Sequence, residues 1–450
     1  MQITLVSHAS VFIDTSGIRI WTDPWLTGQA FNNSWTMLPP PAFTQDLYDT
    51  IDYIWISHEH PDHFSVPTLR AMPEAFKSRV TVLFQEYNSE KIFDAMRRWG
   101  FNNFRALPNR TWIRIGDVEF FAYQIGLIDC SLVIRDGTHM IVNINDCDFN
   151  GHDQAVLARI APNPDVVLNQ FSIAGYDITT DFPNVLRRVA ADKLTRCIDL
   201  HQKLNAKTTV PFASFVYFSA IDNKFVNTYA NSIHDTAVRF EKENCKIVVL
   251  YPGESWAVGM PHDNSASLSK YAEAQQDPDA LHYDIPEPVG LEQLRESFHD
   301  FTATLRANYV RPVLYLLKPL VFDVTDLNQK IRLDFERDTF EPVAKTTPTD
   351  IRLYSQPLWF GFANPFGFET LAVSCRFLIE NNYNGWRRLK VLCILLSKKV
   401  YLKFGRINLQ TVQFIFRRLL TGIIGQLFAK RHRRVSLIKG HRDESTKSAP

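Results

Sequence analysis

Three histidines and an aspartate stand close together in the segment His58–His63, directly after an apolar run. In an extended chain, residues two apart face the same side, so His58 and His60 can point at one metal ion. Asp62 and His63 belong to the following turn and can face a second ion nearby. Neutral imidazoles with a carboxylate suit Zn, Fe or Mn rather than Ca or Cu(I). A polar loop that merely contains histidines is the alternative, and the spacing favours the metal site.

Two divalent ions at these side chains would support either of two reactions. A divalent ion lowers the pKa of bound water and polarises a substrate oxygen, which leads to hydrolysis of an ester, amide or phosphodiester. In that case the Asp62 carboxylate can accept the proton. Iron with open coordination positions can instead activate O2, but it needs electrons from outside. The G-x-S-x-G, G-x-x-x-x-G-K-[ST] and strand-following G-x-G-x-x-G motifs are absent, which disfavours serine-hydrolase, ATP-driven and NAD-driven chemistry.

The segments that must position this site are mostly short strands. Alternating or clustered apolar residues predict strands over residues 2–7, 10–14, 18–22, 52–57, 80–84, 112–115, 118–123, 131–135, 140–144, 166–169 and 247–251. Helical spacing is found over residues 66–76, 89–98 and 184–204. Meandering strands separated by a few helices predict an α/β sandwich with two sheets inside and helices outside.

Length and composition are those of an ordinary globular protein with two to three domains. The chain has 450 residues, 45% hydrophobic and 22% charged, with a formal net charge of +1. Its six cysteines are scattered without C-x-x-C pairs, which argues against a disulfide framework and a cysteine-built metal site. The N-terminus lacks the pattern of a secretory signal, and no apolar run is long enough to span a bilayer. We therefore expect a cytoplasmic protein.

The motif and its preceding glycine-turned hairpin resemble the metallo-β-lactamase superfamily over about residues 1–255. The resemblance implies an αββα sandwich that holds two metal ions at one edge of its sheets. It also implies an aspartate that bridges the two ions, and the matching position is Asp146 in the segment MIVNIND. The alternative for Asp146 is a capping role in the turn that follows.

A narrower resemblance is to the catalytic part of CMP-N-acetylneuraminate hydroxylases. It is carried by residues 129–147, 210–215 and 222–231 and, more weakly, by residues 252–255 and 359–377. That branch couples a metallo-β-lactamase-like domain to a Rieske iron–sulfur domain and hydroxylates a sugar nucleotide. The Rieske pattern, C-x-H followed by C-x-x-H, is absent from these 450 residues, so the resemblance implies a separate electron donor.

Two histidines that many superfamily members use are also missing. The nearest candidate for the first is Asp129, and the sequence VPFAS occupies the strand end of the second. Asp129 is either a carboxylate ligand, which would favour iron over zinc, or a turn residue that orients a ligand. His8 and Asp23 lie where the first hairpin of the superfamily approaches the metals. They are expected to support the ligands from behind, or to be ordinary buried polar residues.

These observations predict a dinuclear enzyme with two divalent transition-metal ions, Fe or Zn. A hydroxylase or oxygenase acting on a nucleotide-sugar or glycan-related small molecule, with an external electron-transfer protein, is the first hypothesis. A zinc-dependent hydrolase of an ester or phosphodiester is the alternative, and a non-catalytic binding module is the second alternative. Nucleic-acid binding is not expected, because no aromatic stacking groove is discernible.

The C-terminal part of the chain is unusually basic. Residues 387–442 contain 15 Lys or Arg and no Asp or Glu, whereas residues 1–386 carry a net charge of −13. Apolar clusters interleaved with these charges predict a basic amphipathic helical segment over 386–442, which either lies on an anionic membrane surface or packs on the acidic body. The predicted domains are therefore 1–255, a smaller α+β domain over 285–385, this segment, and a disordered tail over 443–450.

Overall fold

The computed structural model describes residues 1–86, 90–126, 128–275, 280–408 and 411–412. The chain forms two compact units. Unit 1 contains residues 1–287 together with 370–378, and unit 2 contains residues 288–369 together with those from 379 onward. The predicted tail over 443–450, and the predicted amphipathic helix after residue 412, lie outside the described residues.

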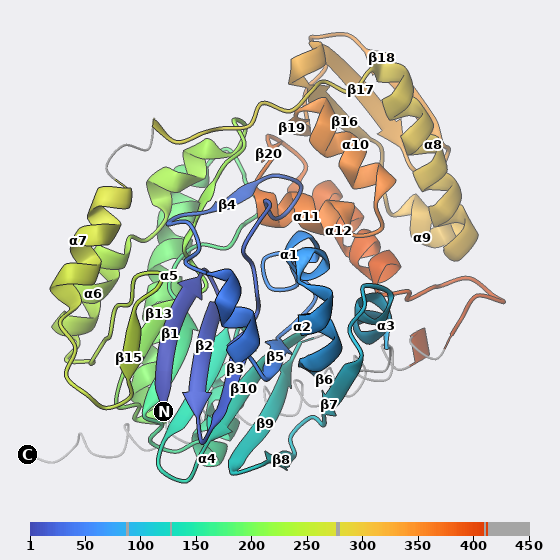
Figure 1. Cartoon of the computed structure of the whole chain (residues 1–450). Coiled ribbons are helices and arrows are strands. Elements are labelled where there is room, and N and C mark those ends of the chain that lie inside the picture. The colour runs from blue at the N-terminus through green and yellow to red at the C-terminus, as the bar shows by residue number, and fades with distance from the viewer. Residues whose placement is uncertain (87–89, 127, 276–279, 409–410, 413–450) are drawn as a thin grey trace, which may run out of the picture. The chain divides into compact units, whose positions relative to one another are not determined.

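Unit 1 is built around two β-sheets (Figure 1). The first has the strand order β15-β1-β2-β3-β5-β6-β7. Its strands are β15 (Ser255–Ala257), β1 (Gln2–Ser7), β2 (Ser10–Thr15), β3 (Ile18–Thr22), β5 (Tyr53–Ile56), β6 (Thr81–Gln85) and β7 (Asn103–Leu107). The strands from β3 to β7 are parallel, whereas the β1–β2 and β2–β3 pairs are antiparallel. The carboxyl ends of β1, β3 and β5 therefore lie at the same edge of this sheet.

The second sheet has the strand order β13-β12-β11-β10-β9-β8. Its strands are β13 (Thr209–Phe212), β12 (Val166–Gln170), β11 (Met140–Asn145), β10 (Asp129–Arg135), β9 (Val118–Ile125) and β8 (Trp112–Ile115). Strands β11, β12 and β13 are parallel, and β10 runs antiparallel to β11. The start of β10 therefore lies beside the carboxyl end of β11. A small sheet pairs β4 (Trp35–Met37) with β14 (Val216–Phe218).

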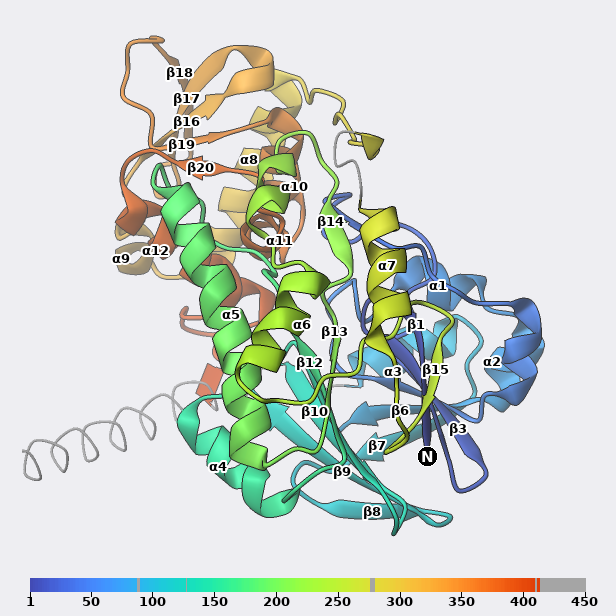
Figure 2. The same cartoon turned by 90° about the vertical axis from the view of Figure 1, so that its left-hand side faces the viewer.

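Alternation along the strands produces three apolar layers. Ile3 and Leu5 of β1 pack in one core with Leu132 and Ile134 of β10, between the two sheets. The outer face of the first sheet is covered by α1 (Val66–Ala71), α2 (Glu74–Arg79) and α3 (Lys91–Arg98). The outer face of the second is covered by α4 (Gly151–Ile160) and α5 (Phe182–Leu204), as Figure 2 shows. This αββα sandwich confirms the predicted fold class.

Two predicted elements differ from the structure. The helix expected over residues 66–76 is two helices, because Pro73 cannot continue a helix and holds Met72 in an extended conformation. The strand expected over 247–251 makes only an isolated bridge, between Ile247 and Thr209. Side chains replace the strand pairing there, since the backbone N–H of Val249 donates to Asn264 and that of Tyr251 donates to Glu254.

The remaining elements of unit 1 are α6 (Ile233–Lys242), α7 (Asn264–Ala274) and short 3-10 helices over Gln45–Thr50 and Lys224–Tyr229. The late segment 370–378 is fixed within the same unit. Arg376 is buried and its Nε donates to both carboxylate oxygens of Asp222, at 2.9 and 3.0 Å. Asn223 donates to the carbonyl of Ser374 at 2.8 Å. Part of the region predicted as the smaller domain thus completes unit 1.

Unit 2 is an α+β arrangement with an aromatic interior. Its sheet contains β18 (Thr339–Val343), β17 (Gln329–Asp334), β16 (Leu320–Val324) and β19 (Ile351–Leu353), and β20 (Leu378–Ile379) marks the return of the chain to this unit. Its helices are α8 (Leu291–Asn308), α9 (Arg311–Tyr315), α10 (Ser355–Ala363), the start of α11 (Gly367–Ser374) and α12 (Tyr383–Ser397). The Phe298 ring packs near the rings of Phe335, Phe340 and Phe362. Trp386 and Leu389 of α12 are buried, so the first part of the basic segment packs inside the protein.

Candidate metal centre

All eight residues singled out in the sequence lie in one cluster at the shared edge of the two sheets. The first sheet supplies His8 after β1, Asp23 after β3, and the segment His58–His63 after β5. The second sheet supplies Asp129 at the start of β10 and Asp146 at the end of β11. Strand direction explains the meeting, because each residue lies at a strand end on this edge.

The segment between β5 and α1 is a tight turn that places its side chains on both sides of the cluster. The backbone N–H groups of His63 and Phe64 both donate to the carbonyl of His60, at 3.0 and 2.7 Å. Ser65 then caps α1 by accepting a hydrogen bond from the N–H of Thr68. The turn reverses the chain between His60 and His63, so the two imidazoles belong to different ligand groups.

The first ligand group, which we call the open group, consists of His58, His60 and Asp129. One donor atom from each lies within 4.8 Å of the others. His58 Nε2 and His60 Nδ1 are 2.8 Å apart. His58 is buried, whereas His60 and Asp129 are partly exposed. Two ring nitrogens and one carboxylate facing a common point can hold a Zn or Fe ion on the side that solvent reaches.

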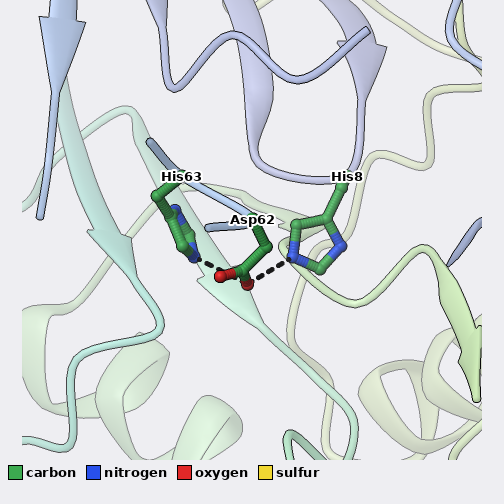
Figure 3. A group of neighbouring side chains, drawn as sticks. All are labelled: His8, Asp62 and His63. Carbon is green, nitrogen blue, oxygen red and sulfur yellow. Dashed lines mark ion pairs between the residues drawn. The ribbon is translucent and has the colours of Figure 1, made fainter. Parts of the chain in front are cut away.

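The second ligand group, which we call the buried group, consists of His8, Asp62 and His63 (Figure 3). Asp62 Oδ2 lies 3.2 Å from His63 Nε2 and 3.4 Å from His8 Nε2. All three side chains are buried, with His8 at 1% and His63 at 0% relative exposure. The group therefore has the same kinds of ligand as the open group, two histidines and one aspartate, but solvent does not reach it.

Asp146 lies between the two groups. One of its oxygens, Oδ2, is 3.6 Å from His58 Nε2 and 3.7 Å from His63 Nε2. These three residues form a further set with donor atoms within 4.8 Å of one another. A carboxylate in this position can contact two ions at once.

Asp23 is fully buried behind His63 and fixes its orientation. Its carboxylate accepts hydrogen bonds from the N–H and the hydroxyl of Ser57, at 2.7 and 2.8 Å, and from Asn145 Nδ2 at 3.2 Å. It also lies 2.9 Å from His63 Nδ1. Because a carboxylate accepts, Nδ1 of His63 carries the proton and Nε2 presents its lone pair to the cluster. Burial raises the pKa of Asp23, and these hydrogen bonds oppose the rise.

The remaining electrostatics favour a cation in the cluster. Burial lowers the pKa of His58 well below its ordinary value and also lowers the pKa of His8. Burial would raise the pKa of Asp62 and Asp146, but the neighbouring imidazoles hold the pKa of each carboxyl below its ordinary value. Burial also opposes the charged form of His63, yet the surrounding carboxylates raise its pKa well above the usual value. Metal ions bind ionised carboxylates and neutral imidazoles, so an ion bound at His63 would replace the proton that the surrounding carboxylates favour there.

Unsatisfied buried atoms show that hydrogen bonds within the described residues do not account for the cluster. No hydrogen-bond partner is found there for Nδ1 or Nε2 of His8, Nε2 of His63, Oδ1 of Asp62 or Oδ1 of Asp146. Buried polar atoms are normally paired, and each such orphan costs about 1–3 kcal/mol. A donor set of imidazole nitrogens and carboxylate oxygens with free lone pairs fits divalent transition-metal ions.

The backbone is strained around this edge. Asp23, Asn145 and Ala213 have φ values of 39°, 64° and 52°, in the left-handed region that residues with a side chain seldom adopt. Asn145 immediately precedes Asp146, and the N–H of Ala213 donates to the carbonyl of His8 at 2.7 Å. Such strain persists only where the surrounding structure fixes it, and it concentrates at functional sites.

Sequence reasoning undervalued one residue. His8 was expected behind the ligands or as a hydrogen-bonded structural histidine, yet both of its ring nitrogens lack a hydrogen bond among the described residues and Nε2 faces Asp62. The only sequence signal is a histidine in the tight turn between two strands. His152 and Asp148 also follow Asp146 closely, but neither belongs to a ligand group among the described residues, and Asp148 pairs with Lys193.

Comparison with known proteins finds similarity to one family in the first part of the chain. Residues 2–123 match the family model described as "Beta-lactamase superfamily domain". The cytidine monophosphate-N-acetylneuraminic acid hydroxylase of Danio rerio is 29% identical over 189 residues, which cover 40% of this chain and 31% of that protein. The protein of the same name from Cricetulus griseus is 24% identical over 274 residues, 56% of this chain and 47% of the relative. The chain therefore spans less than half the length of these relatives.

Solved structures of low similarity are also found. One is CmlA, a diiron beta-hydroxylase from Streptomyces venezuelae, with a TM-score of 0.41 and 16% identity over 57% of this chain and 53% of that chain. The sandwich described above and the family match over residues 2–123 agree on the architecture. The chain thus has the αββα architecture of the metallo-β-lactamase fold, its residues 2–123 match the β-lactamase superfamily model, and it is similar in sequence to CMP-N-acetylneuraminic acid hydroxylases.

Proposed function

We propose that this protein is a dinuclear metal enzyme that hydroxylates a nucleotide-sugar or glycan-related small molecule. The observation that carries the proposal is the donor set, in which two carboxylates (Asp62 and Asp129) belong to the two ligand groups with four histidines and a third, Asp146, lies between the groups. A carboxylate-rich set is harder than an all-histidine set and favours iron over zinc. Iron would supply the redox chemistry of O2 activation, and zinc would supply only Lewis acidity. The similarity to hydroxylases supports the same choice.

Each ligand group holds one ion in this proposal. His58, His60 and Asp129 of the open group would hold the first ion. The buried group would hold the second, with His8 replacing the superfamily histidine whose strand end VPFAS occupies here. Asp146 Oδ2 lies within reach of both groups. His8 and His63 contribute neutral nitrogens, and Asp23 keeps His63 in the tautomer that presents Nε2.

The substrate meets the open group, because His60 and Asp129 are the partly exposed members of the cluster. Asp62 is the proposed proton acceptor, because its carboxylate is ionised and its Oδ1 has no hydrogen-bond partner among the described residues. The Rieske ligand pattern does not occur in these 450 residues, and in this proposal an external electron-transfer protein supplies the electrons.

The activity test compares two metal-loaded forms of the full chain. The iron form is incubated with CMP-N-acetylneuraminic acid, dioxygen and a reduced electron carrier, and the products are analysed by mass spectrometry. We expect a product that has gained one oxygen atom, from the iron form only and only in the presence of dioxygen. Cleavage of the substrate by the zinc form without dioxygen would contradict hydroxylation and support the zinc-dependent hydrolase.

Unit 2 is proposed to dock on an anionic membrane surface. Its exposed apolar side chains include Tyr315 and Leu316 around α9 and Phe404 and Ile407 further on, and Phe404 is 97% exposed. A bridge between Tyr309 and Leu402 brings these two segments together. The basic residues Arg311, Lys318, Lys399, Lys403 and Arg406 lie in or beside the same segments. Apolar side chains among basic ones complement a surface of anionic lipids. In the part of the chain that the structure describes, no helix is long and apolar enough to cross a bilayer.

Vesicle co-sedimentation of the full chain tests this docking. Replacing Phe404 and Ile407 by Ser should weaken binding to anionic vesicles by about tenfold or more, because each buried apolar side chain contributes about 1.5–3 kcal/mol. The control is Val238→Ser, which changes an exposed apolar residue of unit 1. Equal pelleting with neutral and anionic vesicles, or equal loss in the control, would contradict the docking.

A further inference from the structure

A pocket opens beside Asp146 within unit 1. It encloses about 340 Å³ of space, part of it open to solvent, and about 20 Å³ of this admits the centre of a water molecule. Roughly 10–15 Å³ measured in this way is enough for one water. The pocket in its present shape thus has room for one small polar group next to the metal centre, rather than for a whole substrate.

One face of α5 forms a wall of this pocket. Lys193, Arg196, Cys197 and Leu200 all line it, and their spacing of three, four and seven residues places them on one side of the helix. The wall therefore presents an ammonium and a guanidinium to a space whose rim contains Asp146.

These two cations share a single carboxylate. Lys193 Nζ and Arg196 Nη1 lie 3.2 and 3.3 Å from the same oxygen of Asp148, which also lines the pocket. The Asp148 side chain is 68% exposed, and ion pairs with such an exposed partner are weak. Asp148 and the rim residue Asp146 together balance the two cations, and an incoming anion can take the place of the exposed Asp148 carboxylate.

A second polar feature of the pocket points to a ligand. Gln170 is 4% exposed, and its Nε2 donates to the carbonyl of Ala213 at 3.1 Å. Its Oε1 is buried without a hydrogen-bond partner among the described residues, although Gln170 lines the pocket. This oxygen can accept a hydrogen bond from a hydroxyl or amide group that follows the anionic group into the site.

We propose that this pocket is an oxyanion subsite, in which Lys193 and Arg196 bind a phosphate or carboxylate of the substrate. When no substrate is bound, the Asp148 carboxylate pairs with both cations. The assignment rests on the proposed function in so far as the bound molecule is the substrate of the metal centre. It makes Lys193 and Arg196 specificity-determining residues for anionic substrates, and the subsite holds the substrate next to the bridging Asp146.

Calorimetric titration of the full chain tests the subsite without turnover. Inorganic phosphate, CMP and N-acetylneuraminic acid are titrated into the chelator-treated protein, so that direct binding to the metal ions does not contribute. The phosphate and the carboxylate ligands separate the two possible anions. We expect Lys193→Gln with Arg196→Gln to weaken binding of the preferred anion by about tenfold or more. Arg188→Gln, an exposed cation of α5 outside the pocket, should leave binding unchanged.

A substitution that should raise anion affinity distinguishes a direct effect on binding from a general effect on the structure. Asp148→Asn removes the competing carboxylate, so anion affinity should rise by a few fold, about two to five. Unchanged affinity in the double variant, equal loss in Arg188→Gln, or no binding by the chelator-treated wild type would overturn the subsite. Because this readout requires neither ions nor dioxygen, the subsite and the proposed hydroxylation can fail separately.

Discussion

The open group and the buried group use the same kinds of side chain but differ in what surrounds them. His60 and Asp129 of the open group are partly exposed, whereas every member of the buried group is shielded from solvent. Asp23 fixes His63 from behind, and the backbone of His8 is held by the N–H of Ala213. Under the proposed function, this difference suits the buried group to retaining its metal ion and the open group to contact with substrate.

The largest effect is expected where the two groups meet. His63 contributes to the buried group and also lies 3.7 Å from Asp146. The His63→Ala variant should lose both ions, with metal content falling to below about a tenth of an equivalent in elemental analysis. His152→Ala, a histidine near Asp146 in sequence but outside the ligand groups, is the control. Full metal content in His63→Ala would show that the groups do not share this residue.

Variants that change only one group at a time test whether the two groups differ in how firmly they hold a metal ion. His8→Ala should remove the buried ion and His60→Ala the open ion, so each variant should retain about one equivalent of metal. During stepwise addition of a chelator, the single ion of His60→Ala should leave more slowly than that of His8→Ala, because its ligands are buried. Equal rates of release, followed by absorbance of the chelator complex, would erase the distinction between the groups.

A smaller effect is expected from the residue behind the buried group. Asp23→Asn keeps the shape of the side chain but weakens its hold on Nδ1 of His63, and metal affinity should fall about 10–100-fold. Competition with a chromogenic chelator measures the change. The matched control is Asp52→Asn, because Asp52 accepts a backbone hydrogen bond from Arg19 away from the metal centre. An equal loss in both variants would mean that the effect is general destabilisation.

The smallest effect concerns metal preference at the open group. Asp129→His would replace a hard carboxylate by an imidazole and shift the preference of the open ion from iron toward zinc by a few fold, about two to ten. Loading the variant from an equimolar mixture of the two metals, followed by elemental analysis, measures the ratio. A ratio identical to that of the wild type would place Asp129 outside the coordination of the ion.

The sequence predicted the sandwich and the histidine-rich turn because both depend on local signals. Alternating apolar residues located β1 and β3 at their observed bounds, and the spacing from His58 to His63 is short enough to be recognised directly. The lack of a hydrogen bond to either ring nitrogen of His8 among the described residues was not predictable, because it depends on tertiary packing. The pocket at Lys193 could not be predicted from the sequence either, because its lining residues come from α5 and from the ends of β11 and β12.

Anomalous X-ray diffraction from crystals of the metal-loaded protein would show directly whether two ions lie within this one cluster. Data collected at the iron and zinc absorption edges identify each ion. We expect two iron peaks about 3.5–4 Å apart, one among the open group and one among the buried group, with Asp146 between them. A single peak, two zinc peaks, or peaks away from these side chains would contradict it.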